Sequence, residues 1–562
     1  MPITTINSET IIDDIDNHFK VSAGPGAGKT YWLVNHIKNV LHNSDKLFRT
    51  RKIACITYTN IAVETILKRL GTSSEQVEVS TIHSFLYKNI VKPYATFIAT
   101  EFGLDVAEMD GHDDIVLSNY SFLQEWKTRT GQLRINDDNK VVKAFTKLKW
   151  KLKNGELKVK TDYPMLVGKY PIKNDSYLVY KKMMWEKGLV HHDDVLFFSF
   201  QIIEKFPFVL NILSAKFPYI FIDEFQDSNP IQVEIFKKLG LLDCKIGVIG
   251  DVAQSIYKFQ GADYTQFQTF SLPSINEYDL TENRRSSNEI IDVLNHIRID
   301  ICQVKIRNIS ITKPIIFIGD MTLALRATKM KCSNESIYTL SRNNITSNAM
   351  KAEINGSGLD SKLLEKLKEV DSNPKRVNLI YSCIKAIAYG KENKFRDAIK
   401  EFEKLFNYRT DKIIGKRKAL KYITTLLNKH SEFENGTLFE FSDFVRTNLK
   451  PELTKFSKGA IKDFYENNSL KQLLLCVSIP EDMSFHKTIH KAKGDEFDNV
   501  LLVLKEEKDI NFLLEQNLLL NEEHRINYVA ISRARNRLFI SVPTLSTVTQ
   551  TSLQTFYDIE NV

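Results

Sequence analysis

The sequence predicts an α/β fold with parallel sheets and flanking helices, and two stretches support this prediction. Residues 19–41 have the pattern of a short strand, a glycine-rich turn and a helix with apolar residues at every third or fourth position. Residues 217–222 form an apolar run, typical of a buried strand, that ends at Asp223. Because ligands bind at the carboxyl ends of such strands, both stretches place polar residues where chemistry is expected.

The turn at residues 23–30, Ala-Gly-Pro-Gly-Ala-Gly-Lys-Thr, has the composition of a loop that cradles phosphate. Glycine lets backbone N–H groups approach phosphate oxygens, and the positive end of the following helix faces the anion. Lys29 is expected to contact the β- and γ-phosphates, and the Thr30 hydroxyl to bind Mg²⁺. A glycine-rich turn without function is the alternative, which the lysine–threonine pair disfavours. The residues expected to line the nucleotide here are Gly24, Gly26, Ala27, Gly28, Lys29 and Thr30.

Two adjacent carboxylates follow the second strand. Asp223 offers the hard oxygen ligands that Mg²⁺ prefers, and Glu224 is the candidate base for an attacking water. Taken alone, such a pair is usually a solvated loop. The preceding strand and the phosphate loop favour a nucleoside triphosphatase that uses ATP or another NTP with Mg²⁺.

The same segment carries a family resemblance. Residues 223–228, Asp-Glu-Phe-Gln-Asp-Ser, closely resemble motif II of superfamily 1A helicases, the UvrD/Rep/PcrA group. The other motifs follow in order over nearly the whole chain: Ia at 56–60, Ib at 80–85, III at 250–262, IV at 282–286, V at 488–497 and VI at 528–534. The resemblance implies two RecA-like P-loop domains, each with a mainly helical insertion.

The motif order divides the chain into four expected domains. These are RecA-like domain 1A at 1–86 and 200–276, insertion 1B at 87–199, RecA-like domain 2A at 277–345 and 482–562, and helical insertion 2B at 346–481. Insertion 2B is shorter than is usual in the family.

The resemblance also implies catalytic roles. Gln254 matches the glutamine that senses the γ-phosphate, and Glu496 matches a residue that contacts the ribose. Arg285 and Arg533 match two arginines that stabilise charge on the transferring phosphoryl group, a task suited to the planar, always ionised guanidinium. Both arginines are expected on the opposite side of the nucleotide from Lys29. A surface ion pair is the plain alternative for each arginine.

The base-binding positions depart from the family. Thr10 stands where a glutamine normally reads adenine, Arg284 stands where a tyrosine stacks on the base, and Tyr31 follows the loop where arginine is frequent. Stacking and cation–π contact between Tyr31 and Arg284 would hold a base without reading its edge. We therefore expect weaker base selectivity than in typical relatives.

Positions that contact DNA in the family are also present. Proteins hold single strands by basic grooves and aromatic faces on which bases stack. Tyr58, Tyr257 and Phe259 match stacking positions, and a core role is the alternative for Tyr58 and Phe259. The resemblance, and no spacing in the chain, implies movement from 3′ to 5′. The remaining matches, expected to contact the DNA backbone, are Thr59, Asn60, His83, Ser84 and His490.

The net charge of +8 favours an anionic partner. Lysines alternate with apolar residues from Lys147 to Lys160 around Asn154-Gly155, which predicts a hairpin with one apolar face and one lysine face. That face is either a duplex-contacting or strand-guiding patch, or an edge blunted by lysine. The sequence leaves both interpretations open.

Several features limit the function class. No apolar run is long enough to span a bilayer, and the polar, acidic start is unlike a signal peptide. The six cysteines form no CxxC pair, which argues against an iron–sulfur or zinc site and fits reduced thiols in a cytoplasmic protein. Residues 191–194, His-His-Asp-Asp, resemble a family turn, which favours a structural role over a metal site.

The leading functional hypothesis is an ATP-dependent 3′–5′ DNA translocase or helicase that acts on single-stranded or partly duplex DNA. The alternative is a DNA-sensing NTPase that regulates a partner nuclease in antiphage defence, because the compact chain resembles small UvrD-like helicases of the Gabija system. A binding module with an inactive ATPase site is disfavoured by the intact catalytic set.

Overall fold

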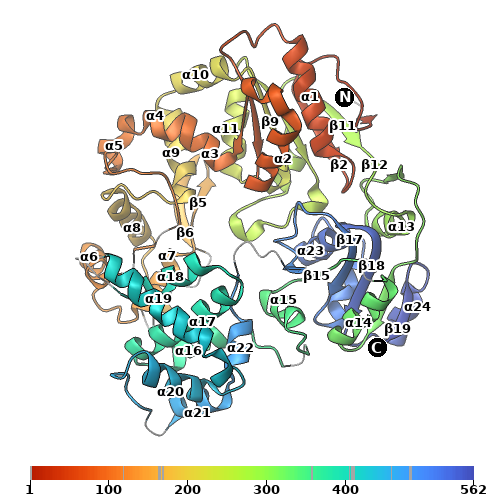
Figure 1. Ribbon diagram of the computed structural model, residues 1–562. Coiled ribbons are helices and arrows are strands. Elements are labelled where there is room, and N and C mark those ends of the chain that lie inside the picture. The colour runs from red at the N-terminus through yellow and green to blue at the C-terminus, as the bar shows by residue number, and fades with distance from the viewer. Residues whose placement is uncertain are drawn as a thin grey trace. The chain divides into compact units, whose positions relative to one another are not determined.

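The computed structural model describes residues 3–114, 116–117, 119–161, 166–167, 170–333, 335–355, 358–403, 405–406, 412–456, 459–479 and 484–562. It contains two compact units (Figure 1). The first comprises Met1–Arg285, Arg298–Arg307 and Leu518–Arg525, and the second comprises Ser286–Ile297, Asn308–Asn517 and Ile526–Val562. The expected α/β class is confirmed, with a large parallel sheet in each unit.

The first unit is built on a seven-stranded sheet in which every neighbouring pair is parallel. Its strands, in spatial order, are β1 (Thr4–Ile6), β11 (Asn276–Leu280), β2 (Phe19–Ala23), β10 (Lys245–Gly250), β9 (Tyr219–Ile222), β3 (Ile53–Thr57) and β4 (Val77–Thr81). Successive side chains of a strand face opposite sides. Tyr219 and Phe221 therefore pack into the core under α1 (Lys29–Asn43), whereas Ile220 and Ile222 pack into the core on the other face.

Most of the segment between β4 and β9 is helical. Apolar residues of this segment share one core with a face of the first sheet. Its main elements are α3 (Ile82–Leu86), α5 (Thr96–Phe102), α6 (Tyr120–Thr130), α7 (Asp138–Phe145), β5 (Leu148–Lys153), β6 (Glu156–Thr161), α8 (Asp175–Trp185), α9 (His192–Lys205) and α10 (Phe208–Lys216). Among the described helices, none alone is long and apolar enough to cross a membrane. α9 and α10 meet that length only as a pair, with a bend of 108° between them.

The hairpin expected around Asn154-Gly155 is confirmed. β5 and β6 are antiparallel, and both turn residues have positive φ, 52° and 79°, as a two-residue type I′ turn requires. Trp150 and its apolar neighbours pack into the core, and the lysines lie on the other face.

The second unit is built on a six-stranded sheet, also parallel throughout. Its strands, in spatial order, are β16 (His486–Thr488), β15 (Ile337–Ser341), β17 (Phe497–Val503), β18 (Ala534–Val542), β14 (Ile315–Ile318) and β19 (Asp558–Asn561). Helices that accompany this sheet include α13 (Asn288–Ile297), α14 (Met321–Lys331), α15 (Asn344–Lys351), α23 (Glu522–Ile531) and α24 (Thr547–Leu553).

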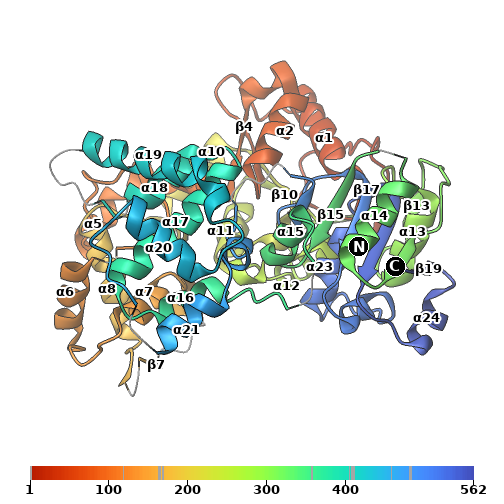
Figure 2. The same ribbon diagram turned by 60° about the horizontal axis from the view of Figure 1, so that its bottom comes forward.

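Between β15 and β16 the second unit carries a bundle with its own apolar core (Figures 1 and 2). Its helices are α16 (Leu363–Val370), α17 (Pro374–Lys391), α18 (Phe395–Glu403), α19 (Lys412–Asn428), α20 (Leu438–Asn448), α21 (Ala460–Asn467) and α22 (Leu470–Leu475). Arg376 forms a bidentate pair with Asp371 inside this bundle, at 2.7 and 2.8 Å, and Tyr465 donates to the same carboxylate at 2.7 Å.

The boundary expected at residue 277 differs from the structure. β11 begins at Asn276 and pairs with both β1 and β2, and β12 (Glu282–Asn283) pairs with β13 (Val304–Lys305). Residues 277–285 and 298–307 therefore belong to the first unit rather than to the second. The physical reason is hydrogen bonding: the parallel pairing of β11 satisfies backbone groups on both sides of that strand.

Candidate nucleotide and DNA sites

The phosphate loop joins β2 to α1. Gly26 and Gly28 have φ of 73° and 84°, in the region that favours glycine. Gly28 is the N-cap of α1, and no side chain caps the helix there. The first N–H groups of α1 are therefore presented to the loop, which is the arrangement that binds phosphate.

Two amides of the first unit fit closely against the loop glycines. A Cβ at Gly24 would lie 2.4 Å from Nε2 of Gln303, and a Cβ at Gly26 would lie 2.7 Å from Oδ1 of Asn283. Nε2 of Gln303 donates to the Pro25 carbonyl at 2.7 Å, and Nδ2 of Asn283 donates to Oε1 of Gln303 at 3.2 Å. Gln303 lies outside every sequence motif, so no pattern in the chain pointed to it.

The expected metal ligands lie together. The Thr30 hydroxyl lies near the Asp223 carboxylate and helps to lower its pKa, and that carboxylate accepts from the Glu224 N–H at 2.9 Å. Burial and the neighbouring Glu224 charge raise the pKa of Asp223 to about 7, although Lys29 opposes that shift. The Thr30 hydroxyl and the neighbouring carboxylates of Asp223 and Glu224 are hard oxygen ligands with a net negative charge. Such a group fits a hard divalent cation such as Mg²⁺.

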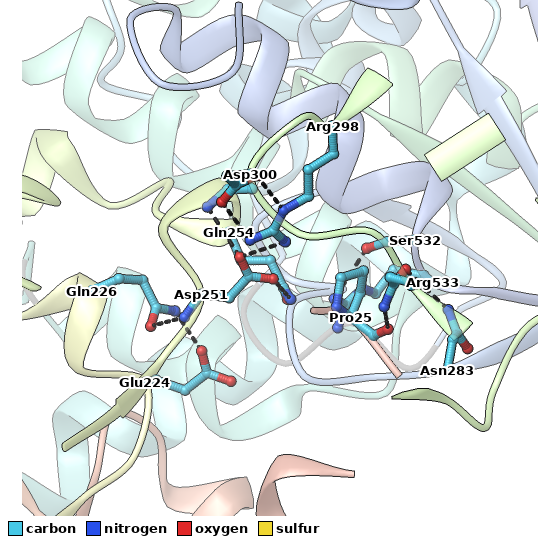
Figure 3. Close-up of polar contacts among 12 residues, drawn as sticks. Pro25, Glu224, Gln226, Asp251, Gln254, Asn283, Arg298, Asp300, Ser532 and Arg533 are labelled. Carbon is cyan, nitrogen blue, oxygen red and sulfur yellow. Dashed lines mark hydrogen bonds and ion pairs between the residues drawn. The ribbon is translucent and has the colours of Figure 1, made fainter. Parts of the chain in front are cut away.

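A chain of hydrogen bonds links the candidate base to the candidate γ-phosphate sensor (Figure 3). Nε2 of Gln226 donates to Glu224 at 2.5 Å, and Oε1 of Gln226 accepts from the Asp251 N–H at 2.9 Å. Gln254 in turn donates to Oδ2 of Asp251 at 2.5 Å. Glu224 has a φ of 53°, a conformation that costs a non-glycine residue about 1–3 kcal/mol and is typical of active sites.

Arg298 stabilises this series of hydrogen bonds through Asp251. Its guanidinium lies 2.8 Å from the Asp251 carboxylate and forms a bidentate pair with Asp300 at 2.7 and 2.9 Å (Figure 3). Arg298 is 4% exposed, so removing its charge would leave Asp251 buried without its cation. Arg298 lies between motifs, so no sequence pattern pointed to it.

The expected base-binding residues meet at Glu9. The Tyr31 hydroxyl donates to the Glu9 carboxylate at 3.2 Å, and Arg284 lies 3.8 Å from the same carboxylate. The Thr10 hydroxyl bonds within its own turn, while its carbonyl accepts from the Trp32 indole at 3.0 Å. Tyr31 and Arg284 thus approach one acidic side chain that the sequence analysis had not assigned.

Arg285 lies beside the phosphate loop within the first unit. A Cβ at Gly26 would lie 2.8 Å from Cβ of Arg285, and the Arg284 N–H donates to the Gly26 carbonyl at 3.0 Å. The sequence analysis expected Arg285 to come from the opposite domain together with Arg533. The structure instead assigns Arg285 to the unit that carries the loop.

Arg533 belongs to the second unit, where it follows α23. Its buried guanidinium donates to the Val529 carbonyl and to the Ser532 hydroxyl, each at 3.2 Å. Glu496, the expected ribose contact, forms an exposed ion pair with Arg535 at 3.4 Å. His490 lies shortly after β16 in the same unit.

Five of the expected DNA contacts in the first unit line one cavity of about 490 Å³. Tyr58, Thr59 and Asn60 enter it from the end of β3, and His83 and Ser84 enter it from α3. Lys149 of the hairpin also lines this cavity, so the lysine face of the hairpin begins at the candidate DNA site.

The three aromatic residues differ in exposure: Phe259 is exposed, Tyr58 is half-buried and Tyr257 is buried. The rings of Tyr58 and Tyr257 stack on each other, with centroids 4.8 Å apart and planes at 16°. Tyr257 is 7% exposed, whereas Phe259 is 65% exposed and lies 6.0 Å from Tyr257. In this conformation Phe259 offers the open face, and the Tyr58–Tyr257 pair forms a support behind it.

Three histidines meet at the same cavity. Nδ1 of His112 lies 2.5 Å from Nδ1 of His192, and the His83 and His192 rings are 6.1 Å apart. Burial, reinforced by the other two histidines, lowers the pKa of His83 to about 4. His83 is therefore neutral at physiological pH, and it offers this cavity hydrogen-bonding groups rather than a positive charge.

The turn at residues 191–194 is used for packing. Asp194 forms a buried ion pair with Lys181 at 2.8 Å and accepts from the indoles of Trp150 and Trp185 at 2.8 and 3.0 Å. Its carboxylate also accepts from the His191 N–H at 3.2 Å. This network holds the hairpin, α8 and α9 together beside the cavity that His83 lines.

Two family models match adjoining parts of the chain. The UvrD/REP helicase N-terminal domain matches residues 5–273, and the UvrD-like helicase C-terminal domain matches residues 273–544. Together they cover both the phosphate loop and the segment that carries Arg533.

Individual relatives agree with the family models. The chain is 27% identical to the Gabija protein GajB of Bacillus cereus (strain HuB5-5), over 50% of this chain and 46% of that protein. It is 26% identical to the ATP-dependent DNA helicase PcrA of Bacillus subtilis (strain 168), over 50% of this chain and 37% of that protein. It is 24% identical to a probable DNA helicase II homologue of Mycoplasma genitalium, over 93% of this chain and 82% of that protein.

The first two alignments thus span less than half of each relative's length. The motifs, the two parallel sheets and both family models point to one assignment. This chain belongs to the UvrD-like helicase family.

Proposed function

We propose that this protein is an ATP-dependent DNA translocase or helicase that moves from 3′ to 5′ on single-stranded DNA. The observation that supports it most is the convergence of Lys29, Thr30, Asp223 and Glu224 at the carboxyl ends of β2 and β9. Both strands neighbour β10, whose end carries Asp251.

Each residue of this group has a distinct task in the proposal. Lys29 binds phosphate oxygens, while Thr30 and Asp223 hold Mg²⁺. Glu224 accepts the proton of the attacking water, and Gln226 orients that carboxylate. When bound, Mg²⁺ would be held by Thr30 and Asp223 and would supply positive charge that neutralises the charge developing on the phosphates.

Three further residues complete the proposed hydrolytic set. Gln254 detects the γ-phosphate and passes its state to Glu224 through Asp251 and Gln226. Arg285 and Arg533 stabilise negative charge on the transferring group. We assign Arg285 to the phosphate-loop side because it packs against Gly26.

DNA binding in this proposal uses both units. In the first unit the strand lies along the cavity of Tyr58, Thr59, Asn60, His83 and Ser84, with bases against Phe259. In the second unit His490 contacts the backbone. Parts 1A and 2A act as the two RecA-like domains in this proposal, and parts 1B and 2B are their insertions. Nucleotide binding closes the two RecA-like domains and hydrolysis opens them.

The test compares hydrolysis with strand displacement. We expect single-stranded DNA to stimulate ATP hydrolysis, and we expect displacement on a fork with a 3′ tail but not on one with a 5′ tail. Lys29→Ala should abolish both activities. Displacement only from the 5′-tailed fork would reverse the proposed polarity, and hydrolysis that ignores DNA would contradict the proposal.

A second candidate function rests on the similarity to the Gabija protein GajB. In it, the chain is a DNA-sensing NTPase that regulates a partner nuclease in antiphage defence and unwinds weakly. The same assay separates the two: DNA-stimulated hydrolysis without displacement, altered by a candidate nuclease, supports the sensor. Displacement that is independent of the nuclease supports the motor.

A further inference from the structure

A second cavity, of about 310 Å³, opens at the carboxyl end of the sheet in the second unit. It lies where β14, β15, β17 and β18 end, and the first turns of α14 and α15 contribute to its wall. Ligands of parallel α/β sheets bind in this position, and the volume is at the lower end of the range for small-molecule sites. The phosphate loop belongs to the other unit, so this cavity is separate from the proposed hydrolytic site.

Two buried hydroxyl groups line the cavity. Ser541 of β18 is 1% exposed, and Thr346 of α15 is 8% exposed. Neither hydroxyl hydrogen-bonds to a residue that the structure describes. Both residues line the cavity, so each hydroxyl is available to hydrogen-bond to a ligand bound there.

The charges favour a ligand with one anionic group. No side chain caps α15, so the first N–H groups of that eight-residue helix are presented at the cavity wall. Lys505, which follows β17, lines the cavity and forms no ion pair with the described residues. Asp320 already caps α14, at 2.8 and 3.1 Å, and its negative charge disfavours a polyanion such as a triphosphate.

The rest of the wall is apolar. Met321, Ile345, Leu359 and Leu504 offer surface for a flat hydrophobic body. A nucleobase presents such a body, its sugar presents hydroxyls, and one phosphate presents the anion. A smaller anion would use the helix end and Lys505 but would leave the apolar wall without a contact.

We propose that this cavity binds a nucleoside monophosphate, with the phosphate at the start of α15 beside Lys505 and the nucleoside against the apolar wall. Ser541 and Thr346 then hydrogen-bond to the nucleoside. The nucleotide is either free in solution or the terminal nucleotide of a DNA strand, because both present the same chemistry. The site goes beyond the proposed function and does not depend on it.

The test uses equilibrium dialysis of the full-length protein with radiolabelled AMP and GMP. The Lys29→Ala variant removes binding at the phosphate loop, and binding of either probe should persist in it. In that background Lys505→Gln and Thr346→Val should each weaken binding at least tenfold. Lys508→Gln, an exposed lysine three residues on, is the matched control and should change binding less than twofold.

Thermal melting of each variant checks folding, and Thr346→Val keeps the side-chain volume. Binding that disappears with Lys29→Ala, or that is unchanged by both cavity variants, would overturn the proposal. A 5′-phosphorylated oligonucleotide then identifies the source. Displacement of the labelled probe in the Lys29→Ala protein indicates a DNA end, and no displacement indicates a free nucleotide.

Discussion

At the scale of single residues, the structure gives the candidate base Glu224 both a hydrogen-bond partner and an unusual backbone conformation. Its side chain accepts from Gln226, and its position in a left-handed conformation is set by the end of β9. We expect Glu224→Gln to lower kcat for DNA-stimulated ATP hydrolysis by about 10²–10⁴, because a positioned base contributes about that factor. ATP affinity should stay within about threefold of wild type, as measured by fluorescent-nucleotide binding.

The matched control for this change is Glu234→Gln on α11 (Pro230–Gly240), a half-exposed glutamate outside the site. It should leave kcat unchanged. Full activity in Glu224→Gln would show that another group takes the proton of the attacking water.

The raised pKa of Asp223 predicts a pH-dependent stability. A carboxyl whose pKa rises from 3.8 to about 7 on folding stabilises the fold below pH 4, and that contribution is lost as pH rises through 7. The loss is roughly 4 kcal/mol, because one pKa unit corresponds to about 1.4 kcal/mol. In EDTA, Asp223→Asn should therefore melt above wild type at pH 8, and the gap should shrink toward pH 5.

Magnesium gives the second arm of this test. It should raise the melting temperature of wild type at pH 8 but not that of Asp223→Asn, since the asparagine is a poorer cation ligand. The exposed Asp110→Asn should behave as wild type at every pH. A gap that grows toward acid pH would contradict the raised pKa.

Motif residues could be predicted from the sequence because their spacing encodes a strand, a turn and a helix N-terminus. Gln303 and Arg298 could not, because each acts through a single long-range contact, with Pro25 and with Asp251. Nothing in their local sequence distinguishes them from surface residues. Glu9 could not be predicted for the same reason, because its contact with Arg284 forms only when the fold brings the two residues together.

At the scale of elements, the hairpin of β5 and β6 carries an electrostatic cost. The register places Lys149 opposite Lys160 and Lys151 opposite Lys158, and like charges directly opposite each other destabilise a pair of strands. Lysines can protect a sheet edge without lying directly opposite each other on the two strands. Lys149 also lines the cavity that contains the expected DNA contacts Tyr58 and His83. These facts favour the DNA-contacting interpretation of the lysine face.

The DNA-contacting and edge-protecting interpretations of the lysine face predict different effects of Lys158→Glu on DNA binding. The change creates an opposite-charge pair with Lys151 but removes the exposed Lys158–Glu156 ion pair at 3.2 Å, so the free energy of unfolding should stay within about 1 kcal/mol of wild type. If the face contacts DNA, the change should nevertheless weaken fork binding and flatten its dependence on salt concentration. The measurement is binding by fluorescence anisotropy at several salt concentrations, alongside thermal melting.

Lys92→Glu, an exposed lysine of α4 (Lys92–Tyr94), is the control for net charge. If Lys158→Glu binds DNA as Lys92→Glu does, the lysine face only blunts an edge.

The hairpin itself was predictable because Asn154-Gly155 fixes a local turn. The pairing of β11 was not, since its sequence, Asn-Glu-Tyr-Asp-Leu, lacks the apolar run that reveals β9.

At the scale of the whole molecule, the phosphate loop and Arg533 belong to different units. Hydrolysis that depends on Arg533 therefore requires both units, whereas nucleotide binding by Lys29 requires only the first. In the proposed mechanism, a hydrolysis cycle that needs residues of both units could be coupled to movement on DNA. The order of motifs led us to expect two RecA-like domains from different parts of the chain, and the residues at the boundary between the two units depend on strand pairing.

Arg533→Lys tests the dependence directly. Lysine keeps the charge but lacks the planar fork of donors, so we expect kcat to fall by about 10²–10³, a part of the 10³–10⁵ that such an arginine contributes. Nucleotide affinity should change less than threefold, and DNA affinity should be unchanged. Arg535→Lys, whose exposed ion pair with Glu496 lies two residues away, serves as the control and should retain kcat within about twofold. Equal loss in the two variants would mean that the segment, not the Arg533 guanidinium, supports hydrolysis. Unchanged kcat in Arg533→Lys would mean that the first unit hydrolyses ATP without a guanidinium from the second.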